Sequence, residues 1–211
     1  MMSERFPAAD FDAWAAHYDA SVQHSEFPFT GYTAALDCVM RRAAARSGES
    51  LLDLGTGTGL LAVRFAALGC SVWATDFSPA MLQKARLRLP QAELVLHDLN
   101  SPWPAVLNRR FDRIVSSYVF HHFPDAQKQA LILELVQQRL SPGGKLILAD
   151  ISFADRSGWQ SAEALAGEAW EEELYWTASE MLPALQMQGL RAEYEQVSYC
   201  AGVYEIEAGS G

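Results

Sequence analysis

A glycine-rich segment follows a run of apolar residues and carries the strongest chemical signal in the chain. It reads LLDLGTGTGLL and places Gly55, Gly57 and Gly59 at alternate positions after the apolar run Ser50–Leu54. Glycines of this kind are needed where φ is positive or where a ligand approaches the backbone closely. A helix that begins after such a turn presents free N–H groups to a ligand. We therefore interpret the segment as a ligand-binding loop between a strand and a helix.

The loop differs from two common phosphate-binding patterns. The dinucleotide fingerprint reads G-x-G-x-x-G, but Leu60 occupies the position of its third glycine. The Gly-Lys-Ser/Thr of a nucleoside triphosphatase loop is absent as well. Asp53 stands two residues before Gly55, where its carboxylate would repel a phosphate and attract an ammonium group. These features argue against a nicotinamide-dependent oxidoreductase and favour a ligand with a positive charge.

Two further acids end the next two predicted strands. Asp76 lies about 20 residues beyond the loop, where a carboxylate can accept hydrogen bonds from both ribose hydroxyls. Asp98 follows the third strand and can accept a hydrogen bond from an exocyclic adenine amine. Because parallel strands end at the same edge of a sheet, Asp53, Asp76 and Asp98 are expected to line one crevice. Together they predict a site for an adenosine that carries an amino-acid tail.

Short apolar runs alternate with helical patterns along most of the chain. The predicted helices cover Leu60–Leu68, Pro79–Leu89 and Ala126–Leu140. Such alternation is typical of βαβ units and a parallel sheet. We expect an α/β fold with a doubly wound, mostly parallel seven-stranded sheet, helices on both faces and an antiparallel C-terminal hairpin within Arg191–Glu207. The runs predicted to form the parallel strands are Ser50–Leu54, Ser71–Thr75, Glu93–Leu96, Arg113–Val119 and Lys145–Ile151.

Two regions lie outside this alternation. Residues 1–49 hold two amphipathic segments, Phe11–Ala20 and Gly31–Ala45, and are expected to form an N-terminal helical cap. Residues 50–211 are expected to form the ligand-binding domain, with residues 153–189 as a helical lid insertion.

The predicted lid is acidic and rich in aromatic residues. Thr177 and Glu180 have the spacing of a capping box, and Pro183 predicts that the following helix starts later or has a kinked axis. The aromatic side chains either line an acceptor pocket or form ordinary core contacts. The glutamates are most simply a solvated face, although they could favour a cationic acceptor. The residues concerned are Trp159, Trp170, Tyr175 and Trp176, and Glu168, Glu171, Glu172 and Glu173.

Composition excludes several other classes of protein. The chain has 211 residues, 16 basic and 26 acidic, with a formal net charge of −10. Half of the residues are hydrophobic, which excludes a disordered chain, and the length of the chain predicts one domain. A deficit of basic residues disfavours nucleic acid as a partner. No segment reads as a transmembrane helix or a secretory signal, and Cys38, Cys70 and Cys200 form no CxxC pair, so we expect a cytoplasmic protein.

Five motifs in order resemble those of the class I methyltransferases that use S-adenosylmethionine. Residues 50–153 contain them, and they read LLDLGTGTG, ATDFSPAML, LHDLNSPWP, FDRIVSSYVFHHF and LSPGGKLILADISF. The flanking segments FDAWAAHYD, EEELYW and CAGVYEI are similar to those of small uncharacterised bacterial methyltransferases. The resemblance implies S-adenosylmethionine as cofactor and methyl transfer by in-line displacement. A non-catalytic module that binds S-adenosylmethionine or S-adenosylhomocysteine is the alternative.

The resemblance also implies roles for individual residues. Gly55 and Gly57 would approach the methionine part of the cofactor, and Asp76 would hold the ribose. Asp98 would meet the adenine, and Tyr18 would close over the cofactor from the N-terminal segment. The predicted cofactor-binding residues are Tyr18, Asp53, Gly55, Thr56, Gly57, Gly59, Asp76, Phe77, Met81, Asp98, Leu99 and Ser117, with Trp14 as a further candidate.

The segment after the fourth strand holds the predicted catalytic residues, Tyr118, His121 and His122. Such side chains at the carboxyl edge can orient a methyl acceptor or take its proton. One histidine of the pair could instead pack structurally. No metal site is expected, because adjacent histidines do not by themselves share a coordination sphere and the sequence shows no third ligand. The predicted acceptor is a small molecule, and the oligomeric state is left open, with a homodimer among the alternatives.

Overall fold

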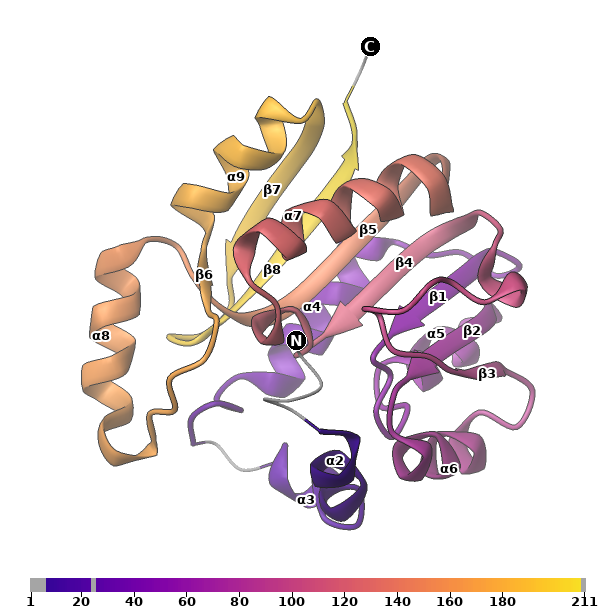
Figure 1. The fold of residues 1–211 in the computed structure, drawn as a ribbon, viewed down its shortest axis with the longest axis horizontal. Coiled ribbons are helices and arrows are strands. Elements are labelled where there is room, and N and C mark those ends of the chain that lie inside the picture. The colour runs from indigo at the N-terminus through magenta and orange to yellow at the C-terminus, as the bar shows by residue number, and fades with distance from the viewer. Residues whose placement is uncertain (1–6, 24–25, 210–211) are drawn as a thin grey trace.

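The computed structural model describes residues 7–23 and 26–209, which form one mixed sheet between layers of helices (Figure 1). The strands are β1 (Ser50–Leu54), β2 (Ser71–Asp76), β3 (Glu93–Leu96), β4 (Phe111–Ser117), β5 (Leu140–Phe153), β6 (Trp176–Thr177), β7 (Leu190–Gln196) and β8 (Ala201–Ala208). Seven of them lie in the order β3-β2-β1-β4-β5-β8-β7, and the short β6 pairs with the end of β5.

The pairing directions follow the predicted pattern. Strands β1 to β5 pair in parallel, whereas β8 runs antiparallel to both β5 and β7. The order of the strands reverses between β1 and β4, and sheets of this kind bind ligands at the carboxyl ends of the strands beside such a reversal. The predicted doubly wound sheet with an antiparallel C-terminal hairpin is therefore confirmed.

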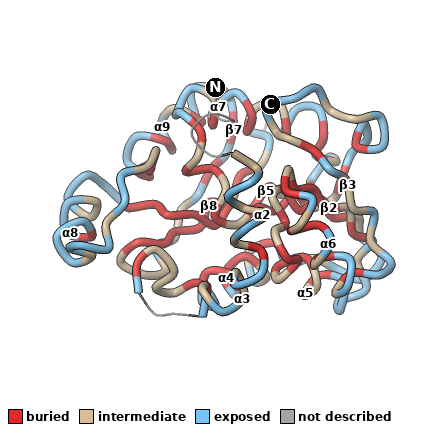
Figure 2. Tube along the Cα trace, turned by 60° about the horizontal axis from the view of Figure 1, so that its bottom comes forward, coloured by how far each residue is buried: buried red, intermediate tan, exposed pale blue. Residues whose placement is uncertain are grey.

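Helices cover both faces of the sheet. They are α2 (Ala8–Trp14), α3 (Tyr18–Ser21), α4 (Tyr32–Ala43), α5 (Ala62–Ala67), α6 (Pro79–Arg88), α7 (Asp125–Glu134), α8 (Arg156–Ala166) and α9 (Ala178–Met187). Helices α4 and α5 share a buried cluster with Leu51 and Ile147, and α7 and α9 share another with Leu52 and Leu148. Alternate residues of a strand thus enter opposite layers, which explains the continuous apolar runs and the buried course of β5 and β8 in Figure 2.

Two predicted boundaries differ from the structure. The helix expected over Phe11–Ala20 is divided into α2 and α3, with the chain turning between them. The helix expected to reach Leu140 leaves the α-helical path at Glu134 and continues as a π-helical turn, Leu135–Arg139. Leu140 instead pairs with Phe111 of β4, so strand pairing there replaces the end of the helix.

The predicted lid divides into an outer and an inner part. Helix α8 lies at the edge of the molecule in Figure 1 and buries only Ala162, whereas α9 packs on the sheet through Met181 and Leu185. Helix α9 includes Pro183, whose missing N–H costs one bond in a helix held by these core contacts. The Thr177 hydroxyl donates to the Glu180 carboxylate at 2.9 Å, so it does not cap the helix as predicted.

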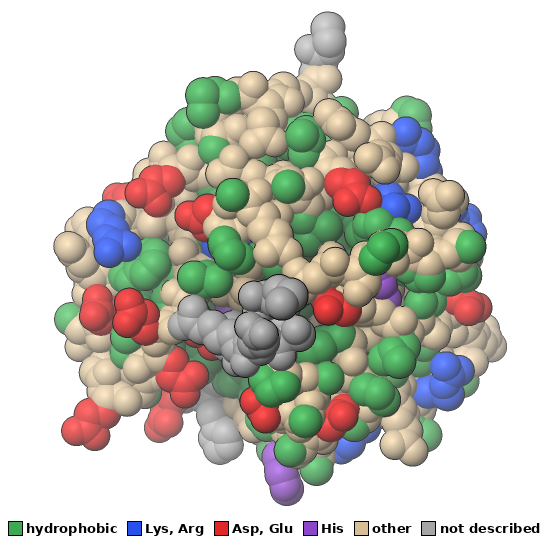
Figure 3. Space-filling view, in the orientation of Figure 1, with side chains coloured by type: hydrophobic (Ala, Val, Ile, Leu, Met, Phe, Trp, Pro, Cys, Tyr) green, Lys and Arg blue, Asp and Glu red, His purple; other side chains and the backbone are tan. Residues whose placement is uncertain are grey.

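The surface carries many acidic side chains (Figure 3), in agreement with the net negative charge of the chain. Acidic side chains gather over the side of the molecule that carries α8, as Figure 3 shows. Within the described part of the chain, no helix is long and apolar enough to cross a membrane.

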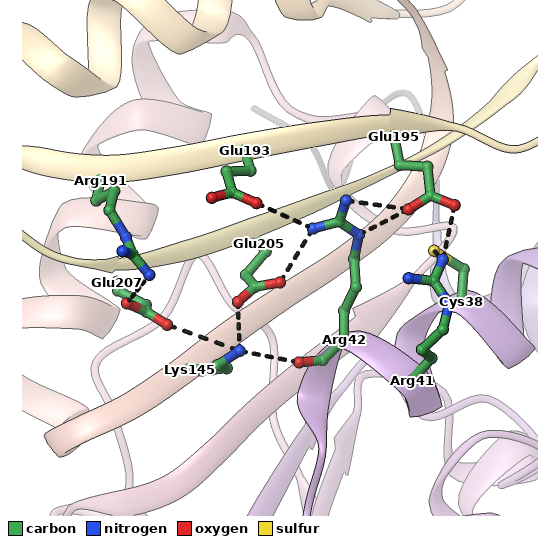
Figure 4. A network of polar contacts seen from close by, with 9 residues as sticks. All are labelled: Cys38, Arg41, Arg42, Lys145, Arg191, Glu193, Glu195, Glu205 and Glu207. Atoms are coloured by element: carbon green, nitrogen blue, oxygen red, sulfur yellow. Dashed lines mark hydrogen bonds and ion pairs between the residues drawn. The ribbon is translucent and has the colours of Figure 1, made fainter.

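A network of ion pairs fastens α4 to the C-terminal hairpin (Figure 4). The Arg42 guanidinium contacts the carboxylates of Glu195 and Glu205, each at 3.0 Å, and that of Glu193 at 3.5 Å. Lys145 of β5 pairs with Glu205 from the other side. The side chains of Arg42 and Glu205 are only 14% and 12% exposed, so solvent screens this pair weakly.

We expect the Arg42→Met variant to be less stable by about 2 kcal/mol, because it leaves the Glu205 carboxylate partly buried and short of a partner. Arg41→Met is the matched control. Arg41 pairs with Glu195 at 2.6 Å, but its side chain is 60% exposed, so the expected loss is below about 1 kcal/mol. Urea denaturation measures both free energies of unfolding. Equal losses would show that burial of the network contributes nothing.

Candidate active site

The glycine loop after β1 presents backbone to a cavity. Gly55 and Gly57 have φ values of +65° and +54°, in the region that favours glycine. A Cβ on Gly55 would lie 2.4 Å from Cγ2 of Val119, so no side chain fits there. A Cβ on Gly57 would meet only the ring of Tyr18, at 3.8 Å from Cε1. The backbone at Gly57 is therefore open to a ligand lying against Tyr18.

Asp76 holds this loop from the end of β2. Its Oδ2 accepts a hydrogen bond from the Gly57 N–H at 2.8 Å, and its Oδ1 accepts one from the Ser78 N–H at 2.9 Å. Burial raises the pKa of Asp76 to about 6, although the backbone hydrogen bonds act in the opposite direction. Asp76 also lines the cavity, and each carboxylate oxygen can accept a second hydrogen bond. The group can thus bind hydroxyls of a ligand while it fixes the loop.

Asp53 lies behind the loop. Its Oδ2 accepts a hydrogen bond from the Thr56 hydroxyl at 2.7 Å, and its buried Oδ1 has no hydrogen-bond partner among the described residues. Burial raises the pKa of Asp53 to about 7, and the nearby charge of Asp76 acts in the same direction. Asp53, Thr56 and Gly59 are absent from the described cavity wall. Asp53 and Thr56 are hydrogen-bonded to each other, and Gly59 faces Leu89 and Ala85.

The N-terminal helices are tied to the same edge of the sheet. Asp12 of α2 accepts a hydrogen bond from the Ser78 hydroxyl at 2.5 Å. Asp19 of α3 accepts one from the Thr58 hydroxyl at 2.6 Å. These contacts place the cap over the glycine loop and bring Tyr18 against it.

One cavity joins the glycine loop to the turn after β4. Its volume is about 460 Å³, within the range of sites for small molecules. The described residues that line it include five acids but no lysine or arginine. The remaining predicted cofactor residues and all three catalytic candidates lie on its wall, namely Trp14, Tyr18, Gly55, Gly57, Asp76, Phe77, Met81, Asp98, Leu99, Ser117, Tyr118, His121 and His122.

Aromatic residues of the cap and lid complete the wall. Phe11 packs edge-on against Phe77 at 4.9 Å and against His122 at 5.8 Å, between ring centroids. Sequence reasoning missed Phe11, because its contact with Phe77 depends on how the cap docks. Of the four lid aromatics, only Tyr175 lies on the described wall, and Trp176 instead stacks on Tyr204 in the core at 4.2 Å. Other wall residues that the sequence did not single out are Asp10, Phe27, Pro28, Phe29, His97, Val119, Phe123 and Ile151.

Two of the predicted surface glutamates belong to this wall. Both Glu171 and Glu173 line the cavity, but Glu171 is exposed, so the expectation of a solvated face fails only for Glu173. The Glu173 side chain is 16% exposed and contacts both histidines. This segment is held by the backbone, because the Leu174 N–H donates to the His121 carbonyl at 3.2 Å.

His121 lies between two carboxylates. It stands in the 3-10 turn Phe120–His122, and its Nδ1 is 2.5 Å from Oδ1 of Asp150 on β5. Its Nε2 is 3.2 Å from Oε2 of Glu173. Burial lowers the pKa of His121, but the two carboxylates outweigh burial and the net shift is upward. Asp150 was not predicted, although it lies near the carboxyl end of the predicted strand Lys145–Ile151, at the same edge as the other strand-end acids.

Tyr118 has a strained backbone at the end of β4. Its φ of +57° is unusual for a residue with a side chain, and such conformations cluster at functional sites. Its hydroxyl is buried without a hydrogen-bond partner among the described residues, while its ring packs on Tyr32 at 5.1 Å. The strained backbone places an available phenol on the cavity wall.

Known proteins share this fold and this sequence pattern. A family model described as a methyltransferase domain matches residues 30–195. An uncharacterized methyltransferase of Geobacillus kaustophilus is 30% identical over 208 residues, which cover 94% of each chain. Among solved structures, the DhpI–SAM–HEP complex has a TM-score of 0.72 at 22% identity and 94% coverage of each chain. Magnesium protoporphyrin IX methyltransferase of Synechocystis PCC 6803 with bound SAH has a TM-score of 0.68 at 18% identity, covering 86% of this chain and 85% of its own.

These matches agree with the sequence and the site. The structural likeness confirms the fold that the five motifs predicted. The family model spans the glycine loop, the strand-end acids and both histidines, and the curated relative matches almost the whole chain. This chain therefore belongs to the methyltransferase-domain family, with the class I methyltransferase fold.

Proposed function

We propose that the protein transfers a methyl group from S-adenosylmethionine to a small-molecule acceptor bound in the same cavity. The observation that carries the proposal is the cavity itself, which runs from Gly57 and Asp76 at one end to His121 and Tyr175 at the other. A single space of this kind brings a cofactor and an acceptor together without intervening solvent.

The residues at the loop end fit S-adenosylmethionine. Asp76 offers acceptors for ribose hydroxyls, and Asp98 and Leu99 lie where an adenine edge is expected. Phe77 and Met81 supply apolar surface for the base. The buried Oδ1 of Asp53, which has no hydrogen-bond partner among the described residues, adds negative charge behind the loop and suits a cationic ligand.

The residues at the other end suit an acceptor. When bound, S-adenosylmethionine supplies an electrophilic methyl group, whose bond to sulfur breaks with the electron pair left on sulfur as the deprotonated acceptor bonds to carbon. We assign acceptor positioning to Tyr118, His121 and His122, which lie on the wall around this space. Asp150 fixes the ring of His121 through Nδ1 and so directs Nε2 towards the cavity.

A small acceptor is favoured by the size and charge of the cavity. The cap and the lid segment with Tyr175 both contribute to its wall, which limits what can enter. The absence of lysine and arginine from its described lining gives a nucleic-acid phosphate no counter-charge. A non-catalytic binding module remains the second candidate, because the same loop would bind the cofactor without transfer.

Two measurements separate these functions. Calorimetry with S-adenosylhomocysteine tests binding, and transfer of a labelled methyl group into a small-metabolite extract tests turnover. The proposal requires both binding and labelled small molecules. Binding without transfer would favour the module, and no binding would contradict both candidates.

Affinity for S-adenosylmethionine is expected to rise about tenfold or more between about pH 5.5 and about pH 7.5. Burial raises the pKa of Asp76 to about 6 and that of Asp53 to about 7, so both carboxyls lose protons across this window. The ionised forms accept hydroxyl hydrogen bonds and attract the cationic ligand, so binding releases protons. Calorimetry in buffers of different ionisation enthalpy counts those protons. An affinity independent of pH would contradict the assignment. The Asp53→Asn variant should lose only the pH dependence of affinity near pH 7.

A further inference from the structure

Three side chains at the acceptor end converge on a small volume. The ligating atoms of His121, His122 and Glu173 all lie within 4.8 Å of one another. Glu173 Oε2 is 3.2 Å from Nε2 of His121 and 3.6 Å from Nδ1 of His122. Two ligands bound at 2.0–2.1 Å to one tetrahedral ion are about 3.3 Å apart. The two separations from Glu173 lie on either side of that value, and the ligating nitrogens of the two histidines lie within 4.8 Å of each other.

The hydrogen bonding of His121 leaves its second ring nitrogen facing this volume. Its Nδ1 faces the Asp150 carboxylate at 2.5 Å and must donate there, because an ionised carboxylate only accepts. In the neutral ring, Nε2 then presents a lone pair towards the Glu173 carboxylate. A proton can bridge these two atoms, but the same proton cannot bridge His122, whose Nδ1 lies beyond hydrogen-bond distance at 3.6 Å. One divalent ion could contact all three groups.

Asp150 supplies an independent feature of metal sites. Histidine ligands usually donate their second ring N–H to a carboxylate, which fixes the ring and raises its basicity as a ligand. Asp150 is fully buried, and its Oδ1 also accepts the N–H of Ile151 at 2.9 Å. The carboxylate is thus immobile on β5 and orients His121 towards Glu173.

Backbone hydrogen bonds also fix the segment that carries Glu173. The residue after Glu173 donates its N–H to the His121 carbonyl, and its own carbonyl accepts from the fully buried Lys128 at 2.5 Å. The N–H of Leu174 thus joins the lid segment to the histidine turn, and its carbonyl joins the segment to α7. The glutamate therefore comes from a different segment and closes a site that the adjacent histidines alone would leave incomplete.

We propose that His121, His122 and Glu173 form a binding site for a zinc-class divalent cation, with an open coordination position facing the cavity. Two imidazoles and one carboxylate are a ligand set of zinc sites that keep one position for water or substrate. The use of that position by the acceptor rests on the proposed function. A thiol or hydroxyl placed there would release its proton to solvent more readily and become a better methyl acceptor.

Metal binding can be tested without any acceptor. The tag-free full-length protein is treated with a chelator, dialysed and titrated with Co²⁺ alone, followed by visible absorption and then by displacement with Zn²⁺. We expect about one equivalent of Co²⁺ with the absorption of a four- or five-coordinate ion. Glu173→Gln should weaken binding by about tenfold or more, and Asp150→Asn by about 10- to 100-fold.

Glu168→Gln is the matched control, since Glu168 is an exposed lid glutamate outside the described cavity wall, and it should bind Co²⁺ as the unmodified chain does. If the unmodified chain binds neither Co²⁺ nor Zn²⁺, the inference is overturned. His121 and Glu173 are then bridged by a proton alone. Equal binding by Glu173→Gln would overturn it as well, because the ion would then lie elsewhere. S-adenosylhomocysteine calorimetry on the same samples tests the proposed function separately and confirms that each variant is folded.

Discussion

Asp76→Asn is expected to weaken S-adenosylmethionine binding by about 100-fold. The ionised carboxylate can accept from two ribose hydroxyls, and hydrogen bonds to charged groups contribute about 1.5–3 kcal/mol each. An amide keeps the shape but loses the charge, and its NH₂ group offers donors where acceptors are needed. The same change disturbs the bond from the Gly57 N–H to Oδ2 and so loosens the loop. Calorimetry gives the affinity.

The control for this variant must separate binding from folding. Asp37→Asn alters a carboxylate on α4 that is 68% exposed and outside the cavity wall, so its affinity should equal that of the unmodified chain. Thermal melting without cofactor reports the folded stability of both variants. If Asp76→Asn folds and binds with unchanged affinity, the ribose is held elsewhere.

His121→Asn is expected to lower the rate of methyl transfer by about 100-fold or more, the range for misplacing an acceptor that must be held in line with the methyl group. The change removes Nε2 from the acceptor end of the cavity and leaves the residues of the glycine loop unaltered. Affinity for S-adenosylhomocysteine should therefore stay the same. Single-turnover transfer and calorimetry on one preparation provide the two readouts.

His17→Asn is the matched control for this second variant. His17 is an exposed residue between α2 and α3, outside the described cavity wall, and its substitution should leave transfer unchanged. Transfer by His121→Asn at the rate of the unmodified chain would remove this histidine from the site. Loss of cofactor affinity would instead mean that His121 supports the cavity structurally.

The fold could be predicted from local patterns because each strand and turn is specified by adjacent residues. Ser50–Leu54 is a strand both in the prediction and in the structure, and α6 begins at Pro79 after a Ser78 cap. Leu140 was wrongly included in the helix that follows Pro124, because it pairs with Phe111, a partner remote in sequence. The division of the predicted N-terminal helix into α2 and α3 likewise depends on contacts with Ser78 and Thr58, which no local pattern encodes.

The cofactor half of the candidate site could be predicted from the sequence more fully than the acceptor half. The cofactor half follows from topology, since acids and glycines at strand ends must meet at one edge of a parallel sheet. Asp53 shows the limit of that reasoning, because a strand-end position does not say whether a side chain faces the ligand or the loop's rear. Glu173 reaches His121 only through the packing of the lid segment, so its role becomes visible only in three dimensions.

The acid-lined cavity distinguishes S-adenosylmethionine from S-adenosylhomocysteine by charge. Methyl transfer converts a sulfonium into a neutral thioether, so the bound nucleoside loses one positive charge while its shape barely changes. A wall with five acids and no described lysine or arginine attracts the charged form more strongly. The departing nucleoside is thus held less tightly than the incoming one, and inhibition by product should be correspondingly weak.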